Sequence, residues 1–183
     1  MRRASLALVF CLAAAPVLGQ ASSPSPGPLR FTLFGSSYGV GYSSRDGAFG
    51  DGALGVALEY RWHARLGLEL SVSGSRHEVG FVRDNRFFEE SVTTHPIDLM
   101  GQYYFSTDGP WKPYLGLGVH YVEGPRSSVT GLEDHLSPQF NAGVEYLIGS
   151  RLSLTLDAKR RLDGDYVAYD PVLKASLGFG WRF

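Results

Sequence analysis

The stretch Leu177-Gly178-Phe179-Gly180-Trp181-Arg182-Phe183 closes the chain and decides its fold. Large apolar residues alternate there with glycine or arginine, which is the two-residue period of a β-strand with one apolar face. The last residue is aromatic. Because the same alternation recurs in about eight segments along the chain, the sequence predicts an all-β protein.

The expected strands share one design, in which one parity is apolar and the other carries glycine, hydroxyl or charged residues. They cover residues 29–42, 54–63, 66–73, 97–105, 114–121, 140–148, 152–159 and 173–183. In the first strand, Leu33 and Phe34 are both large and apolar although their parities differ. A β-bulge near Gly35 would bring them onto one face.

The expected connections alternate in length along the chain. Those near Ala64, at 106–112 and at 149–150 are short, whereas those at 43–52, 81–89, 124–137 and 161–170 are longer. An even number of strands with short turns at one end and long loops at the other is typical of bacterial outer-membrane barrels. We therefore expect an eight-stranded antiparallel transmembrane up-and-down β-barrel, with both termini in the periplasm; a soluble β-sandwich is the competing fold.

The N-terminus has the three parts of a secretory signal peptide. Arg2 and Arg3 are basic, residues 6–17 form an apolar run, and small residues precede Gln20. We expect residues 1–19 to be the signal peptide, with cleavage after Ala21 as the alternative, residues 20–28 to be a flexible Pro/Ser linker, and residues 29–183 to form the barrel. The apolar run is too short for a spanning helix.

Charge and cysteine content exclude several classes of site. The only cysteine, Cys11, lies in the expected signal peptide, so the mature chain can hold no disulfide, no Cys-ligated zinc and no cysteine nucleophile. The mature chain would carry 15 basic and 18 acidic residues, a net charge near −3, which argues against binding to nucleic acid. Serine and histidine are close at Ser91 and His95, and at His120 and Ser128, but neither pair lies in a recognisable hydrolase pattern. We expect no enzyme activity and no cofactor.

Aromatic residues gather near the ends of the expected strands. Those at the short-turn end are Tyr60, Trp62, Tyr103, Phe105, Trp111, Tyr146, Trp181 and Phe183. Those toward the long loops are Tyr42, Phe81, Tyr121 and Phe140. Two such belts mark the two interfaces of a membrane. We therefore expect outer-membrane lipid to surround the apolar parity.

The opposite parity is charged, and we expect it to line the interior. Its charged residues are Glu59, Arg61, Glu69, Asp98, Glu145, Asp157, Lys159, Lys174 and Arg182. If the turn at Ala64 places Trp62 opposite Leu66, Glu59 falls opposite Glu69. Two carboxylates in that position need a cation, which Arg61, Lys174 or Arg182 could supply. The network could be a structural plug or a selectivity element.

Several motifs resemble one family of small barrels. The segments THPIDLMGQYYF (94–105), WKPYLGLGVHY (111–121) and AGVEYL (142–147), with Tyr169-Asp170-Pro171 and the ending Gly180-Trp181-Arg182-Phe183, resemble the OmpW family. The resemblance covers about half of the chain, residues 94–183. It implies an eight-stranded barrel with a narrow, largely apolar ligand passage. This chain departs from that family in its shorter external loops and its charged inward positions.

Two functions follow as hypotheses. The first is a passive pathway for small apolar solutes, which would enter near residues 124–137, pass His120 and Asn141 in the upper lumen, and leave sideways above a charged floor. The second is a closed structural or surface-interaction barrel, like OmpX or the membrane domain of OmpA. Phe179, Trp181 and Phe183 resemble the C-terminal signal that the barrel-assembly machinery reads during insertion.

Overall fold

The computed structural model describes residues 28–39, 51–83, 86–123, 134–162 and 173–183. The expected signal peptide, nearly all of the linker and most of three long loops lie outside these residues. The strands are β1 (Leu29–Gly39), β2 (Asp51–His63), β3 (Leu66–Arg83), β4 (Arg86–Thr94), β5 (Ile97–Tyr104), β6 (Trp111–Val122), β7 (His135–Ile148), β8 (Leu152–Arg161) and β9 (Leu173–Arg182). Among the described residues, no helix is long and apolar enough to cross a membrane.

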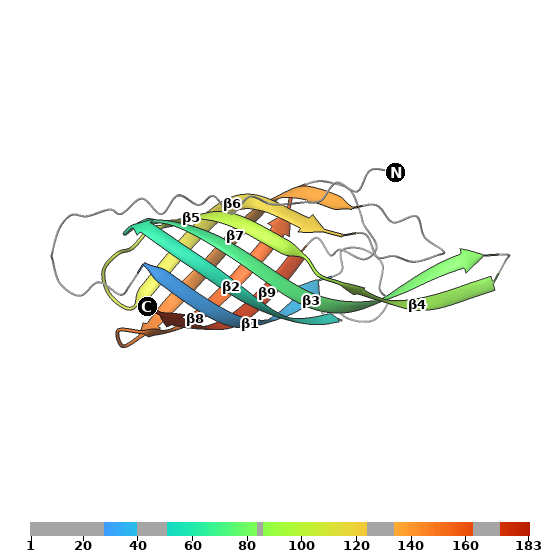
Figure 1. The fold of residues 1–183 in the computed structure, drawn as a ribbon, viewed down its shortest axis with the longest axis horizontal. Coiled ribbons are helices and arrows are strands. Elements are labelled where there is room, and N and C mark those ends of the chain that lie inside the picture. Colours follow the sequence, from blue (N-terminus) through green and yellow to red (C-terminus); the bar gives the residue numbers. More distant parts are fainter. Residues whose placement is uncertain (1–27, 40–50, 84–85, 124–133, 163–172) are drawn as a thin grey trace.

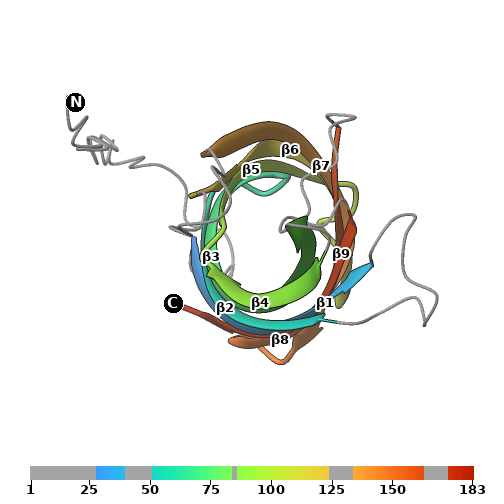
Figure 2. The same ribbon diagram turned by 90° about the vertical axis from the view of Figure 1, so that its right-hand side faces the viewer.

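The strands close into a barrel. Their order around the sheet is β2-β1-β9-β8-β7-β6-β5-β3-β4, and β2 also pairs with β3, which completes the ring (Figures 1 and 2). Every pairing is antiparallel. Within the described residues, every strand of the ring is paired on both sides, as a structure that spans lipid requires; β4 pairs only with β3 and extends beyond the ring (Figure 1).

Nine strand segments make an eight-stranded barrel because β4 and β5 are two halves of one barrel strand. Val72 of β3 pairs with Ile97 of β5, and Ser75 of β3 pairs with Thr94 of β4, so the register is unbroken between them. Pro96 interrupts the strand because it has no N–H for the ladder, although its carbonyl still accepts a hydrogen bond from the Ser73 amide at 3.1 Å.

The alternation of faces agrees with the prediction along every barrel strand whose side chains are described, except in part of the first. Outward residues such as Leu54, Leu117 and Leu177 are 78%, 64% and 63% exposed, whereas the inward parity is mostly buried and polar. This inside-out distribution is the arrangement of a transmembrane barrel, whose apolar face meets lipid. The predicted fold class is therefore confirmed.

The first strand differs from the prediction, because it contains no bulge near Gly35. Its register with both neighbours is continuous from Arg30 to Tyr38. Phe34 instead points into the barrel and is 9% exposed. It fits there because Gly55 and Gly178, on the flanking strands, leave space that a Cβ would fill.

The turn after β2 also closes differently. His63, not Trp62, lies opposite Leu66, and a register shift between Arg61 and His63 absorbs the extra residue. Glu59 nevertheless pairs with Glu69, as the sequence predicted. The turn after β7 begins at Gly149, whose φ of 71° suits a residue without a Cβ.

Several strands extend further toward the loop end than predicted. The strands β3 and β4 run through most of the expected loop 81–89, and residues 51–52 and 135–137 belong to β2 and β7. Beyond the membrane both faces of a strand meet water, so apolar alternation stops while backbone pairing continues. The pattern therefore underestimated the lengths of these strands. Below, the turn end is the end with the connections 64–65, 105–110 and 149–151, and the loop end is the opposite one.

Candidate functional site: a polar network inside the barrel

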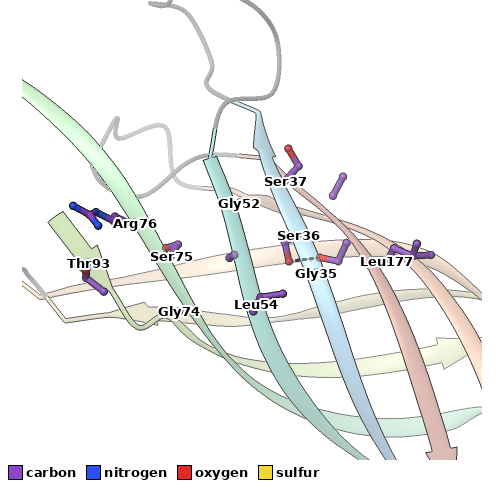
Figure 3. Close-up of a pocket in the computed structure, with 13 residues that line it drawn as sticks. Gly35, Ser36, Ser37, Gly52, Leu54, Gly74, Ser75, Arg76, Thr93 and Leu177 are labelled. Carbon is purple, nitrogen blue, oxygen red and sulfur yellow. Dashed lines mark hydrogen bonds between the residues drawn. The ribbon is translucent and has the colours of Figure 1, made fainter. Parts of the chain in front are cut away.

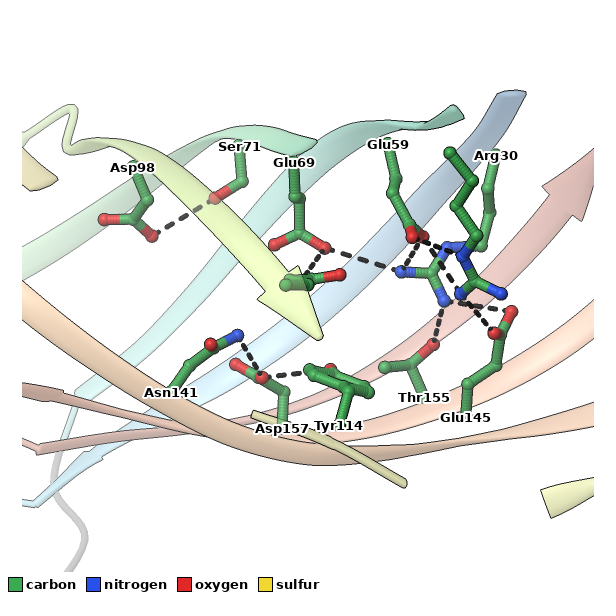
Figure 4. Close-up of polar contacts among 12 residues, drawn as sticks. Arg30, Glu59, Glu69, Ser71, Asp98, Tyr114, Asn141, Glu145, Thr155 and Asp157 are labelled. Atoms are coloured by element: carbon green, nitrogen blue, oxygen red, sulfur yellow. Dashed lines mark hydrogen bonds and ion pairs between the residues drawn. The ribbon is translucent and has the colours of Figure 1, made fainter. Parts of the chain in front are cut away.

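Ionic side chains from seven strands meet inside the barrel, and Figure 4 shows part of their network. The cations are Arg30, Arg61, Lys159, Lys174 and Arg182. The carboxylates are Glu59, Glu69, Asp98, Glu145 and Asp157. All of these side chains share the inward parity of their strands. Buried charges are stable only when each has partners, so the positive and negative side chains of this interior must compensate each other.

At the turn end, Glu145 of β7 is the centre of an arginine cluster. Its carboxylate lies 3.0 Å from Arg30 Nη1, 2.7 Å from Arg61 Nη2 and 2.6 Å from Arg182 Nη2. The side chain of Glu145 is completely buried. The guanidinium of Arg61 also stacks on the Tyr104 ring, 3.5 Å from its centroid, a favourable cation–π contact.

Arg30 of β1 joins the carboxylates of two neighbouring strands. Its Nη2 lies 2.7 Å from Glu59 Oε2 and 3.5 Å from Glu69 Oε2. It is therefore the cation that the opposed Glu59–Glu69 pair requires. Tyr104 adds a hydrogen bond, since its hydroxyl donates to Glu59 Oε1 at 2.7 Å.

Lys159 of β8 extends the network toward the loop end. Its ammonium group donates to Glu69 Oε1 at 3.1 Å, to Ser71 Oγ at 3.2 Å and to Asp98 Oδ2 at 3.2 Å. Three partners match the three N–H bonds of a lysine. Glu69 thus contacts both Arg30 and Lys159, which makes the two halves of the network continuous.

Asp98 of β5 carries the network to the loop end. Its Oδ1 lies 2.5 Å from His120 Nδ1, and its Oδ2 lies 3.7 Å from Lys174 Nζ. Lys174 also donates to Ser73 Oγ at 3.2 Å. The ionic contacts therefore follow one another from Arg182, beside the turns, to Lys174 on the last strand.

A side branch fills the wall of β6, β7 and β8. The Tyr114 hydroxyl donates to Asp157 Oδ2 at 3.0 Å, and Asn141 Nδ2 donates to the same oxygen at 3.1 Å. Gly116 and Gly143 make room for these groups, because a Cβ at Gly116 would collide with the Asn141 amide and one at Gly143 with the Tyr114 ring. The inward glycines Gly116 and Gly143 of this wall are therefore close-packed.

Little free space is left among these side chains. A cavity of about 30 Å³ lies against Arg30, Thr32, Tyr114 and Asp157, which corresponds to about one water molecule. Arg30 Nε, Thr32 Oγ1 and Asp157 Oδ1 have no protein hydrogen-bond partner. A water molecule in this cavity could satisfy them. The described part of the network contains no cluster of three or more His, Asp or Glu suited to a metal ion.

The nine charged residues singled out from the sequence all lie in this network. His120 and Asn141, which were expected to line a solute path, are 6% and 0% exposed and bond to Asp98 and Asp157. Sequence reasoning missed Arg30, which contacts three carboxylates. Arg30 lies between the outward residues Leu29 and Phe31, and this alternation could have predicted that Arg30 points inward. The bulge expected in the same strand left the inward parity of the strand undecided.

The aromatic residues of the turn end form an outward girdle. Seven of those expected there are exposed by 39–66%: Tyr60, Trp62, Tyr103, Phe105, Trp111, Trp181 and Phe183. Trp111 contacts Tyr146 across β6 and β7, with ring centroids 4.6 Å apart. Phe179 lies on the same face as Trp181 and is 48% exposed. Tyr42 lies outside the described residues, and the side chain of Phe81 is not described.

Comparisons with known proteins agree with this architecture. The family model of the outer membrane protein beta-barrel domain matches residues 4–183. No curated protein matches the chain. The outer membrane protein OprG from Pseudomonas aeruginosa is a similar solved structure, with a TM-score of 0.67 and 20% identity over 86% of this chain and 97% of that one.

Two further structures share the fold. The N-terminal β-barrel domain of Pseudomonas aeruginosa OprF has a TM-score of 0.58 and 17% identity, over 86% of this chain and 99% of that chain. Neisserial surface protein A has a TM-score of 0.56 and 18% identity, over 86% and 97%. At these identities the likeness establishes the fold alone.

Proposed function

Because the chain belongs to the outer membrane protein beta-barrel domain family, we propose that it is a closed barrel that serves the outer membrane as a structural or surface-interaction element. The chain is an outer-membrane β-barrel. In this proposal the barrel has no through-pore, no enzyme activity and no cofactor. Its partners would be the surrounding lipid and, during insertion, the barrel-assembly machinery.

The continuous ion network is the observation that carries this proposal. Contacts run from Arg182 through Glu145, Arg30, Glu69, Lys159 and Asp98 to Lys174. An aqueous pore would require several of these buried pairs to separate, and breaking one such pair costs about 3–5 kcal/mol when a charge is left unpaired. An eight-stranded barrel is only wide enough to be filled by its side chains.

We also propose the orientation. Leu29 and Phe183 lie side by side at the turn end, where the Phe183 amide donates to the Leu29 carbonyl at 2.9 Å. Short turns face the periplasm in outer-membrane barrels. Both termini would then be periplasmic, and the loop end would face the cell exterior.

The competing function is an OmpW-like passive pathway for small apolar solutes. It is supported by the motifs of residues 94–121, which resemble that family. The route along His120 and Asn141 is occupied by their bonds to Asp98 and Asp157. Transport by this route would require both side chains to leave these partners.

Two measurements on the purified barrel in lipid distinguish the functions. In planar bilayers we expect no channel conductance, with a general porin as the positive control. In liposomes we expect an apolar fluorescent probe to enter at the same rate with and without the protein. Faster uptake that is slowed by His120→Trp or Asn141→Trp would support the apolar pathway instead. Stable single-channel conductance would overturn the closed barrel.

A further inference from the structure

A second feature lies on the outer face, away from the ion network. It is a groove of about 880 Å³ over β9, β1, β2 and β3, near the loop end (Figure 3). Most of its lining residues have the outward parity: Gly35, Ser37, Gly52, Leu54, Gly74, Arg76, Thr93, Ala175 and Leu177. Its volume falls in the range of small-molecule binding sites.

The floor of the groove consists of residues with little or no side chain. Gly35 of β1 pairs with Leu177 of β9 and with Leu54 of β2, and Leu54 pairs with Gly74 of β3. A Cβ at Gly35 or Gly74 would have its nearest neighbour 3.9 Å away. Packing therefore does not demand glycine at these positions. Glycine weakens a strand, and in a strand it often marks a site where another molecule approaches closely.

The groove lies at the edge of the apolar belt. Its lower rim consists of Leu54 and Leu177, the most exposed apolar side chains of their strands. Toward the loop end the outward side chains of β1, β3 and β4 become polar, with Ser37 on β1 and the paired residues Arg76 and Thr93 on β3 and β4, whereas β9 remains apolar at Ala175. An apolar floor below and polar groups above suit a molecule with an acyl chain and a polar headgroup.

Arg76 gives the upper rim a positive charge. Its Nε donates to Ser91 Oγ at 2.5 Å, and among the described residues no carboxylate forms an ion pair with it. A guanidinium has five N–H donors, and the contacts among the described residues use one of them, which leaves four for a ligand. Arginine binds phosphate through two parallel hydrogen bonds.

We propose that this groove binds a phosphate-bearing acylated lipid of the leaflet at the loop end. An acyl chain lies on Gly35 and Gly74 beside Leu54 and Leu177. The phosphate accepts hydrogen bonds from Arg76, with the hydroxyl groups of Ser37 and Thr93 nearby. Charge favours a phosphate-bearing lipid over a second copy of this chain as the occupant, since the groove rim carries a cation that forms no ion pair with a carboxylate among the described residues.

The experiment titrates the detergent-solubilised full barrel with dioleoyl phosphatidic acid and follows complexes by native mass spectrometry. Dioleoylglycerol has the same chains without the phosphate, and inorganic phosphate has no chains. We expect one phosphatidic acid to bind, with both other probes weaker by at least about tenfold, since each lacks one half of the recognition.

Matched variants test the two halves of the groove. Arg76→Gln should raise the dissociation constant of phosphatidic acid about tenfold, whereas Arg160→Gln, an exposed arginine on β8, should not change it. Gly35→Leu should fill the groove and weaken binding, whereas Gly101→Leu, an outward glycine of β5, should not. If Gly35→Leu fails to fold, as judged by its mobility on unheated gels, Gly74→Leu takes its place.

Three results would overturn the proposal. The first is equal binding by the groove variants and their controls. The second is inorganic phosphate binding as tightly as the lipid, which would indicate a free-anion site. The third is a dimer, formed without added lipid, that Gly35→Leu disrupts, because the groove would then be an interface between copies of this chain.

Discussion

Arg30 shows how one side chain can connect most of a barrel interior. It is 1% exposed and contacts carboxylates on β2, β3 and β7. Its Nη1 also donates to Thr155 on β8 at 3.3 Å. No other cation among the described residues of the network reaches so many strands through ion pairs and hydrogen bonds. Its loss should therefore affect the barrel as a whole.

Replacing Arg30 by methionine should lower the free energy of unfolding by about 3–5 kcal/mol, because Glu59, Glu69 and Glu145 would each lose a buried cation partner. Glu69→Gln should cost less, since Arg30 and Lys159 both keep other carboxylate partners. Urea unfolding in lipid vesicles measures both. Arg160→Met, on the outer face, is the control. A cost for Arg30→Met no greater than that of the control would contradict the role assigned to Arg30.

The outward residues give a second prediction at this scale. Arginine placed at Val56, Leu68, Leu117 or Leu154 should destabilise the barrel by about 2–4 kcal/mol near the midplane of the membrane. The cost should fall for Leu54→Arg, which lies near the loop end. The same unfolding assay applies. Equal costs at all depths would show that the assumed membrane level is wrong.

At the scale of the element, β9 has two roles. It closes the barrel against β1, through partners from Arg182 at Arg30 to Leu173 at Gly39. Its outward face also ends in Leu177, Phe179, Trp181 and Phe183, all exposed. A packing role and an assembly role can be separated, because only assembly requires the cell.

Deleting Phe183 should reduce the amount of barrel inserted in the outer membrane more than it reduces stability after refolding in detergent. Phe183 is 66% exposed, so its removal forfeits little protein packing. Membrane fractionation measures the first quantity and thermal unfolding the second. Leu162→Ala, an exposed apolar residue after β8, is the control. Equal losses in both assays would make Phe183 a packing residue only.

At the scale of the whole molecule, the β1–β9 seam decides whether the sheet is closed. The inward hydroxyls of Ser36 and Ser176 face each other across it, 3.0 Å apart. Directly opposed residues of an antiparallel pair have Cα atoms about 4.5–5.5 Å apart, which suits a disulfide. The barrel region has no cysteine of its own.

The double variant Ser36→Cys/Ser176→Cys should therefore form an intramolecular disulfide on oxidation. Loss of free thiols and a shift on non-reducing gels would measure it. The pair Ser36→Cys/Ser153→Cys, with the second residue at the turn end of β8, should keep its thiols. Free thiols in the first variant would mean that the seam is open in the membrane.

Local patterns in the sequence were sufficient to predict the barrel, the alternation of its faces and the inward position of its charged residues. The reason is that a strand in a barrel has only two faces, so parity alone assigns each side chain to lipid or lumen. The pairing of Glu59 with Glu69 could also be predicted, by counting residues back from the turn at Ala64 along both strands. It is observed although His63, and not Trp62, lies opposite Leu66.

Only the tertiary structure decided which charges meet. Arg30 and Glu145 lie 115 positions apart in the sequence and contact each other at 3.0 Å, which no local pattern encodes. Phe34 faces inward because glycines on two other strands make room for it. The groove over Gly35 and Gly74 likewise requires four strands in register. Parity is a property of one strand, whereas pairing, space and shape arise only when the ring closes.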